Sequence, residues 1–266
     1  MTLDELFAQL QQHDTLTIPE GWSQGRTTYG GLVAGLMLQK GMFSLVDTQQ
    51  QLLSASVTFV GPVSQDAPIR LSVEILRQGK SVTTLEVRLW QEDAVQSILL
   101  ASFGHARESR IAWSDLPNSP IMRPVEELDM LVPLPVLMPE CYQQFQLAWE
   151  NGQYPCTASK TPDFGGYCRI DPKQHPAQPM TAAHLMTLVD IWPPGVLPMF
   201  RRVAPASSLT WHLTYVQPLQ QTTEEWLQYQ VHTDYAADGY ATESAHIWDQ
   251  HGRLIAICRQ TITVFA

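Results

Sequence analysis

Two short stretches of this 266-residue chain decide its fold: Ser54-Ala-Ser-Val-Thr-Phe-Val-Gly-Pro62 and Thr210-Trp-His-Leu-Thr-Tyr-Val-Gln-Pro218. Each is an alternating run rich in β-branched and aromatic residues, which predicts a strand, and each ends at a proline. The two stretches start 156 residues apart. This self-similarity predicts a duplicated unit, with one of the two strands in each copy.

The surroundings of the two strands repeat as well. A candidate helix rich in small residues, Tyr29–Gln39, precedes the first strand, and another, Thr181–Ile191, precedes the second. Short links with Gly or Asp join the later strands, as in β-hairpins. The predicted later strands are Ile69–Arg77, Ser81–Trp90 and Ser97–Arg107 in the first copy, and Trp226–Tyr235, Tyr240–Trp248 and Leu254–Phe265 in the second. A helix followed by antiparallel strands, twice, predicts an α+β fold with one continuous sheet.

The segment between the copies differs in composition. The span 108–179 holds 11 of the 19 prolines, which are excluded from helix interiors and central strands. Its last part, Asp163–Ile170, is predicted to open the second copy. We therefore expect an N-terminal repeat at 1–107, a Pro-rich linker at 108–160 and a C-terminal repeat at 161–266.

Charge and composition narrow the classes of partner. The chain has 16 basic and 26 acidic residues, a formal charge of −10, which argues against nucleic acid and anionic membranes. No run of 18 apolar residues and no signal peptide is visible. The four cysteines match neither a zinc site nor a CxxC pair. We expect a cytoplasmic protein with reduced thiols and with no metal or cofactor.

The order of these motifs resembles the type II acyl-CoA thioesterases, which are double hot-dog enzymes. The resemblance covers nearly the whole chain outside the linker and implies a double hot-dog fold, an acyl-CoA substrate, hydrolysis of its thioester and a role in lipid metabolism. The motifs that carry it are Tyr29-Gly-Gly, Ser54–Pro62, Arg77-Gln-Gly-Lys-Ser81 and Ser97–His105 in the first half, and Leu188-Val-Asp190, Ser207–Pro218 and Gly252–Gln260 in the second.

The resemblance also implies three residues that hold and activate a water molecule. They are Asp190 at the end of the second helix, Ser208 at the start of the next strand and Gln260 on the last strand. Ser208 stands where the family has Thr. We expect Thr210 to lie on the same strand face as Ser208, so Thr210 is the alternative hydroxyl. A carboxylate among the apolar residues 185–191 is costly to bury, and burial would make it a better base.

Other parts of a thioesterase site have several candidates. Backbone amides at Gly30 and Gly31, or at the start of the second helix near Ala182, are candidates to bind the developing oxyanion. Arg77 and Lys80 are candidates to meet the phosphates of coenzyme A, as are Arg201 and Arg202. The first repeat has Ala34 at the position 156 residues before Asp190, so we expect one working site per chain.

Two other functions stay open at this point. The protein could be a non-catalytic acyl-CoA or lipid-binding hot-dog protein, or a hot-dog enoyl-CoA hydratase, because Asp171-Pro-Lys-Gln-His175-Pro faintly resembles a hydratase motif. A triad of Ser207, His212 or His184, and Asp190 is disfavoured, since no Gly-x-Ser-x-Gly elbow exists. We also expect a homo-oligomer, a dimer or higher, formed through exposed sheet surfaces.

Overall fold

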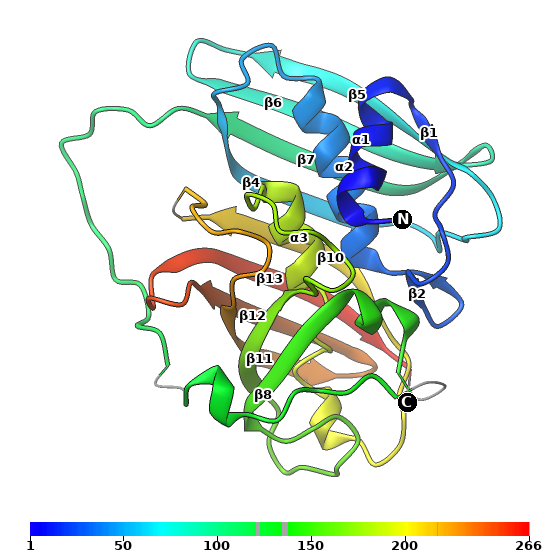
Figure 1. The fold of residues 1–266 in the computed structure, drawn as a ribbon, viewed down its shortest axis with the longest axis vertical. Helices are drawn as coiled ribbons and strands as arrows, with labels where there is room; N and C mark the ends of the chain where they lie inside the picture. Colours follow the sequence, from blue (N-terminus) through cyan, green and yellow to red (C-terminus); the bar gives the residue numbers. More distant parts are fainter. Residues whose placement is uncertain (121–122, 135–137, 217, 266) are drawn as a thin grey trace.

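The computed structural model describes residues 1–120, 123–134, 138–216 and 218–265. Eleven strands in these residues form one antiparallel sheet, and Figure 1 shows its two halves one above the other, with the helices in front of it. The strand order is β1-β5-β6-β7-β4-β10-β13-β12-β11-β9-β8. The helices are α1 (Leu3–Gln12), α2 (Gly30–Phe43) and α3 (Ala182–Val189).

The strands of the sheet have the following bounds. In the first half they are β1 (Thr15–Leu16), β4 (Gln51–Phe59), β5 (Ile69–Gln78), β6 (Val82–Gln91) and β7 (Ala94–Gly104). In the second half they are β8 (Phe145–Gly152), β9 (Phe164–Ile170), β10 (Ala206–Tyr215), β11 (Leu227–Ala237), β12 (Tyr240–Trp248) and β13 (Leu254–Val264). A separate small hairpin pairs β2 (Ser23–Gln24) with β3 (Thr27–Thr28).

The two halves join through the strands that decide the fold. β4 and β10 are antiparallel neighbours, paired from Thr58 with Thr210 to Ser54 with Thr214. Ser56 pairs directly with His212, its counterpart 156 residues later, as expected for two units related by a local twofold axis. The α+β fold with one continuous sheet, predicted from the sequence, is therefore confirmed. Gln217, near the end of the second motif, lies outside the described residues.

The helix α1 and the edge strand β8 were not predicted. Helix α1 begins at a capping box formed by Thr2 and Glu5 and buries an apolar face that includes Leu6 and Leu10. Strand β8 lies inside the stretch predicted as linker and pairs with β9 at the sheet edge. The division of the chain at residues 107 and 161 stays a prediction. No helix of the described residues is long and apolar enough to cross a membrane.

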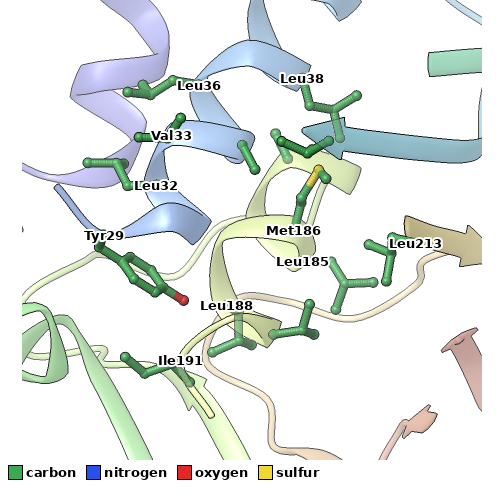
Figure 2. Packing of buried hydrophobic residues seen from close by; sticks show 14 of the residues in the cluster. Tyr29, Leu32, Val33, Leu36, Leu38, Leu185, Met186, Leu188, Ile191 and Leu213 are labelled. Carbon is green, nitrogen blue, oxygen red and sulfur yellow. The ribbon is translucent and has the colours of Figure 1, made fainter. Parts of the chain in front are cut away.

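The two repeats also meet through α2 and α3, which cross in the middle of the molecule. Figure 2 shows apolar side chains of both helices packed around this crossing. At the contact itself α2 presents glycines: a Cβ on Gly31 would lie 2.7 Å from the Thr187 carbonyl oxygen, and one on Gly35 would overlap Thr187 Oγ1. Gly31 and Gly35 therefore allow α3 to approach α2 closely. Gly41, in contrast, faces the sheet at Leu85.

We expect Gly35→Ala to lower the free energy of unfolding by about 2 kcal/mol, because the overlap with Thr187 outweighs the helix propensity gained with Ala. Gly41→Ala is the matched control in the same helix, since its nearest neighbour is a flexible Leu85 methyl at 3.0 Å. Urea unfolding of both variants measures the difference. Adding Thr187→Ala to Gly35→Ala removes the overlapping hydroxyl and should restore part of the loss; equal stability of the two glycine variants would contradict the close-contact explanation.

Candidate active site

Helix α3 ends at Asp190, and tyrosine hydroxyls hold it at both ends. Tyr215 donates a hydrogen bond of 2.6 Å to the carbonyl of Ala182 in the first turn, and Tyr29 donates one of 2.7 Å to the carbonyl of Thr187 in the last turn. The Tyr29 bond satisfies one of the carbonyls that a helix end leaves without a partner. Tyr29 belongs to the first repeat, so each repeat contributes to fixing the position of Asp190.

The Asp190 carboxyl lies against the start of α2. A Cβ on Gly30 would come within 3.0 Å of Asp190 Oδ2, and the backbone amide of Gly31 faces the carboxyl and favours its ionised form. Free amides and the positive end of the helix dipole both attract negative charge at such a position. The alternative at Ala182 lies at the opposite end of α3, about 12 Å from Asp190 by helix geometry.

The three residues predicted to hold a water molecule lie together. Gln260 Nε2 donates a hydrogen bond to Ser208 Oγ and lies 3.5 Å from Asp190 Oδ1, at the outer limit of a hydrogen bond. The Gln260 amide thus faces both the hydroxyl and the carboxyl. Three elements supply the cluster: β10, β13 and the end of α3. The catalytic role of this trio stays a prediction.

Thr210 does not belong to this cluster, and its placement on the face of Ser208 was wrong. A β-bulge at Leu209 breaks the alternation of β10: Ser208 pairs with Ile262, Thr210 with Thr261 and Trp211 with Gln260. The extra residue reverses the side on which the following residues point. Trp211 therefore joins Ser208 on the inner face, and Thr210 is exposed on the outer face.

A small cavity lies beside the Asp190 carboxyl. It measures about 10 Å³, room for about one water molecule. Aromatic rings form much of its wall, and the ring of Trp192 stacks on that of Tyr229 with 5.0 Å between centroids and 7° between planes. The lining residues are Val189, Asp190, Trp192, Trp211, Tyr229, Glu243, Ala245, Cys258 and Gln260.

The enclosure of Asp190 changes its acidity. Although part of the residue reaches solvent, protein atoms surround its carboxyl, and this burial raises the pKa of Asp190 from 3.8 to about 7. The Gln260 amide and the Gly31 amide act against this shift but do not cancel it. A carboxyl group with a pKa near neutrality can exchange a proton with a bound water at the pH of a cell.

One acidic residue of the cavity was missed in the sequence. Glu243 is 3% exposed and pairs directly with Gln260 on the neighbouring strand. A signal for it existed, because Ala241, Glu243, Ala245 and Ile247 are alternate residues of the predicted strand Tyr240–Trp248. A carboxyl group in the middle of an inward-facing apolar row is unusual enough to mark a candidate site.

The histidines of the Ser-His-Asp triad and hydratase hypotheses lie away from the cavity. His184 bonds to Asp4 at the far end of α3, and His212 on the outer face contacts Ser56 Oγ at 2.7 Å. His175 of the hydratase-like motif is buried, where it accepts a hydrogen bond from the Leu3 amide and contacts Gln144. Ser207 is exposed. Among the described residues no group of His, Cys, Asp and Glu side chains is arranged to hold a metal ion.

The predicted contacts with coenzyme A are not brought together in one chain. Arg77 lies next to the last residue of β5, and Lys80 lies in the turn after it. Four strands separate β5 from β13, about 24 Å along the sheet. Arg201 and Arg202 are nearer in the chain, exposed in the segment that leads into β10. This placement favours Arg201 and Arg202 over Arg77 and Lys80 as phosphate contacts within a single chain.

The corresponding positions of the first repeat are apolar. Trp211, Gln260 and Glu243 form a row across β10, β13 and β12. The equivalent row across β4, β7 and β6 is Ala55, Ala101 and Leu85, all buried. Ala34 is also buried. The polar cluster is therefore confined to the second repeat, which supports the prediction of one site per chain.

Comparison with known families identifies the chain. The model of the acyl-CoA thioesterase N-terminal domain matches residues 18–104, and that of the C-terminal domain matches residues 118–264. The chain belongs to the acyl-CoA thioesterase family. Among curated proteins, none matches this sequence.

Several solved structures share the fold of this acyl-CoA thioesterase family member. A hot-dog protein of unknown function from Alicyclobacillus acidocaldarius is 21% identical, with 98% of both chains covered and a TM-score of 0.84. The tesB protein of Mycobacterium avium subsp. paratuberculosis is 15% identical over 100% of both chains, with a TM-score of 0.78. The acyl-CoA thioesterase II TesB2 of Mycobacterium marinum is 20% identical over 99% of this chain and 98% of the other, with a TM-score of 0.74. These similarities confirm the double hot-dog fold.

The raised pKa of Asp190 predicts a stability effect with a definite sign. The folded state binds the carboxyl proton more tightly than the unfolded state, so this group destabilises the fold progressively as the pH rises from about 4 to about 7. We expect the free energy of unfolding of Asp190→Asn, relative to that of the wild type, to increase by on the order of 2 kcal/mol between pH 5 and pH 8. Urea unfolding at both pH values measures this. Asp93→Asn, in the exposed turn between β6 and β7, is the control; the same pH dependence in Asp190→Asn and the wild type would contradict the burial of this carboxyl.

Proposed function

We propose that this protein hydrolyses the thioester of acyl-CoA with a water molecule activated by Asp190 and held by Gln260 and Ser208. One observation carries the proposal: a carboxyl with a pKa of about 7 borders a cavity with room for one water molecule, beside an amide and a hydroxyl. Membership of the acyl-CoA thioesterase family supports the substrate class.

The chemistry follows from these groups. The water oxygen attacks the thioester carbonyl carbon while Asp190 takes a proton from the water, and the carbonyl oxygen becomes an oxyanion. When the oxyanion collapses, the carbon–sulfur bond breaks with its electron pair on sulfur, and the sulfur receives the proton from Asp190. Free coenzyme A leaves as a thiol, the acyl group leaves as a carboxylic acid, and Asp190 is ionised again.

The first repeat supplies the candidate for oxyanion stabilisation. Gly30 opens α2 beside Asp190, and a free amide at a helix start stabilises developing negative charge. Ser208 and Gln260 suit the positioning of water, because a hydroxyl both donates and accepts and an amide has both a donor and an acceptor end. Neither has to transfer a proton in this scheme.

Replacing Asp190 by Asn tests the function itself. We expect kcat for acyl-CoA hydrolysis to fall at least about 100-fold, since the amide cannot take the proton of water. Binding of a non-hydrolysable acyl-CoA thioether should persist. Release of free thiol and calorimetric titration give the two readings, across short, long, branched and aromatic acyl groups. No hydrolysis of any of them by the wild type would favour a non-catalytic acyl-CoA-binding protein instead.

The bulge in β10 provides a matched pair of hydroxyl variants. We expect Ser208→Ala to lower kcat about tenfold, because the water and Gln260 lose a hydrogen-bond partner in a buried site. Thr210→Ala, two residues away on the outer face, should change kcat less than about twofold. The same steady-state assay measures both. Equal effects of the two substitutions would remove Ser208 from the site.

The cellular location, the metabolic role and the oligomeric state belong to the same proposal. We assign the protein to the cytoplasm and to lipid metabolism, and we expect a homo-oligomer, a dimer or higher. The outer face of the sheet offers a surface for such assembly, with Leu100 43% exposed on β7 and Leu209 38% exposed on β10. A second chain could also bring basic residues such as Arg77 towards bound coenzyme A.

A further inference from the structure

The cavity beside Asp190 contains a second buried carboxyl group, that of Glu243, which the proposed reaction does not use. Glu243 is 3% exposed and lines the cavity together with Asp190 and Gln260. One of its oxygens, Oε2, accepts a hydrogen bond of 2.7 Å from the backbone amide of Gly195. Gln260 lies directly opposite Glu243 on β13, and side chains in such a pair are close neighbours. Glu243 is thus fixed in place at the water site.

The charges around Glu243 give it no compensating cation. Three carboxylates act on it, and among the described residues no salt bridge reaches Glu243 itself. The basic side chains nearby contact two of those carboxylates instead: His232 contacts Asp163 at 3.1 Å and Arg259 contacts Asp234 at 3.1 Å. The groups that act on or pack around Glu243 are Asp163, Asp190, Asp234, Gly195, Tyr229, Thr233, Cys258 and Gln260.

We propose that Asp190 and Glu243 work as one acid–base pair, in which the active state has Asp190 ionised and Glu243 protonated, so that the cavity carries a single negative charge. Two carboxyl groups in one water-poor site cannot readily both be ionised, because each charge raises the cost of the other. The proposal rests on the proposed thioesterase function, and it assigns Glu243 a positioning role, since Glu243 keeps its proton through the reaction.

The surroundings decide which of the two carboxyls ionises first. Burial raises the pKa of Asp190 to about 7, while the Gln260 and Gly31 amides beside it favour its ionised form and limit the rise. Burial raises the pKa of Glu243 to about 8; the single Gly195 amide lowers it, whereas the three carboxylates of Asp163, Asp190 and Asp234 raise it further. Because the two environments push the groups apart, the singly protonated pair has a defined arrangement. At a pH high enough to ionise Glu243 as well, its second negative charge would repel the oxyanion formed in the reaction.

Titration of the substrate-free protein tests the pairing without any activity measurement. Side-chain carboxyl carbons of the full chain, labelled with 13C, are followed by NMR in the wild type, Asp190→Asn and Glu243→Gln. We expect the Glu243 midpoint to fall by about half a pH unit or more in Asp190→Asn, because its neighbouring anion is gone. The Asp190 midpoint should stay close to its wild-type value in Glu243→Gln, since Glu243 is still neutral when Asp190 ionises. An unchanged Glu243 midpoint in Asp190→Asn would overturn the proposal.

The pH profile of hydrolysis tests the working state. We expect wild-type kcat to rise through pH 7 and to fall about tenfold per pH unit above pH 8, as the second proton leaves. In Glu243→Gln, whose amide oxygen can still accept from Gly195, the rise should remain and the alkaline fall should disappear. Glu86→Gln is the control and should keep the wild-type profile. Glu86 lies on β6 of the first repeat, next to Leu85, which is the counterpart of Glu243.

The outcomes separate the two proposals. An alkaline fall retained in Glu243→Gln would overturn the acid–base pair while leaving the thioesterase function intact. Absence of hydrolysis by the wild type would overturn the function, and the NMR titration would still decide whether Asp190 and Glu243 share their protons. Equal thermal unfolding of Glu243→Gln and the wild type at pH 6 checks that the variant is folded.

Discussion

The arrangement of the molecule depends on the close contact of two helices that belong to different repeats. Side chains at Gly31 and Gly35 would strike Thr187, so their absence allows α3 to lie directly on α2. The contact aligns the end of α3 with the start of α2, and the Tyr29 hydroxyl secures that alignment through the Thr187 carbonyl. Without this approach, Asp190 and the amides of Gly30 and Gly31 would not share one site.

The site therefore lies where the two repeats meet, and neither repeat alone supplies all of its groups. The second repeat contributes the carboxyl, the hydroxyl and the amide side chain, and the first contributes a helix start whose backbone groups favour negative charge. Burial and these amides act on Asp190 in opposite directions, and burial is the stronger influence. The result is a carboxyl whose protonation changes near neutral pH, which neither environment would produce alone.

Much of the fold was predictable because alternation of side chains along a strand is a direct consequence of backbone geometry. The strand Tyr240–Trp248 has the predicted bounds, and the pairing of β4 with β10 follows from the repeated motif. Helix α1 was missed, although Thr2 and Glu5 form a recognisable capping box before an apolar run. Strand β8 was missed because the prolines around it indicated a linker.

The site was predictable in part. Asp190, Ser208 and Gln260 came from resemblance to a family, and they lie together, whereas the sequence alone gave no reason to bring residues 52 and 70 positions apart into contact. Thr210 was misplaced because strict alternation was assumed, whereas the bulge at Leu209 depends on how two strands fit together and was not foreseen from one strand alone. Glu243 was overlooked although its strand pattern placed it inward. Arg77 and Lys80 were chosen for charge, which says nothing of distance.

The contrast between the two inner faces has an energetic consequence for the duplicated architecture. Where the second repeat has Trp211, Gln260 and Glu243, the first has Ala55, Ala101 and Leu85. Acidic groups enclosed by protein weaken a fold at neutral pH, and a symmetric molecule would bear that penalty twice. The apolar core of the first repeat thus offsets the instability that the buried acidic groups cause in the second repeat. Because both repeats belong to one polypeptide, they stay together.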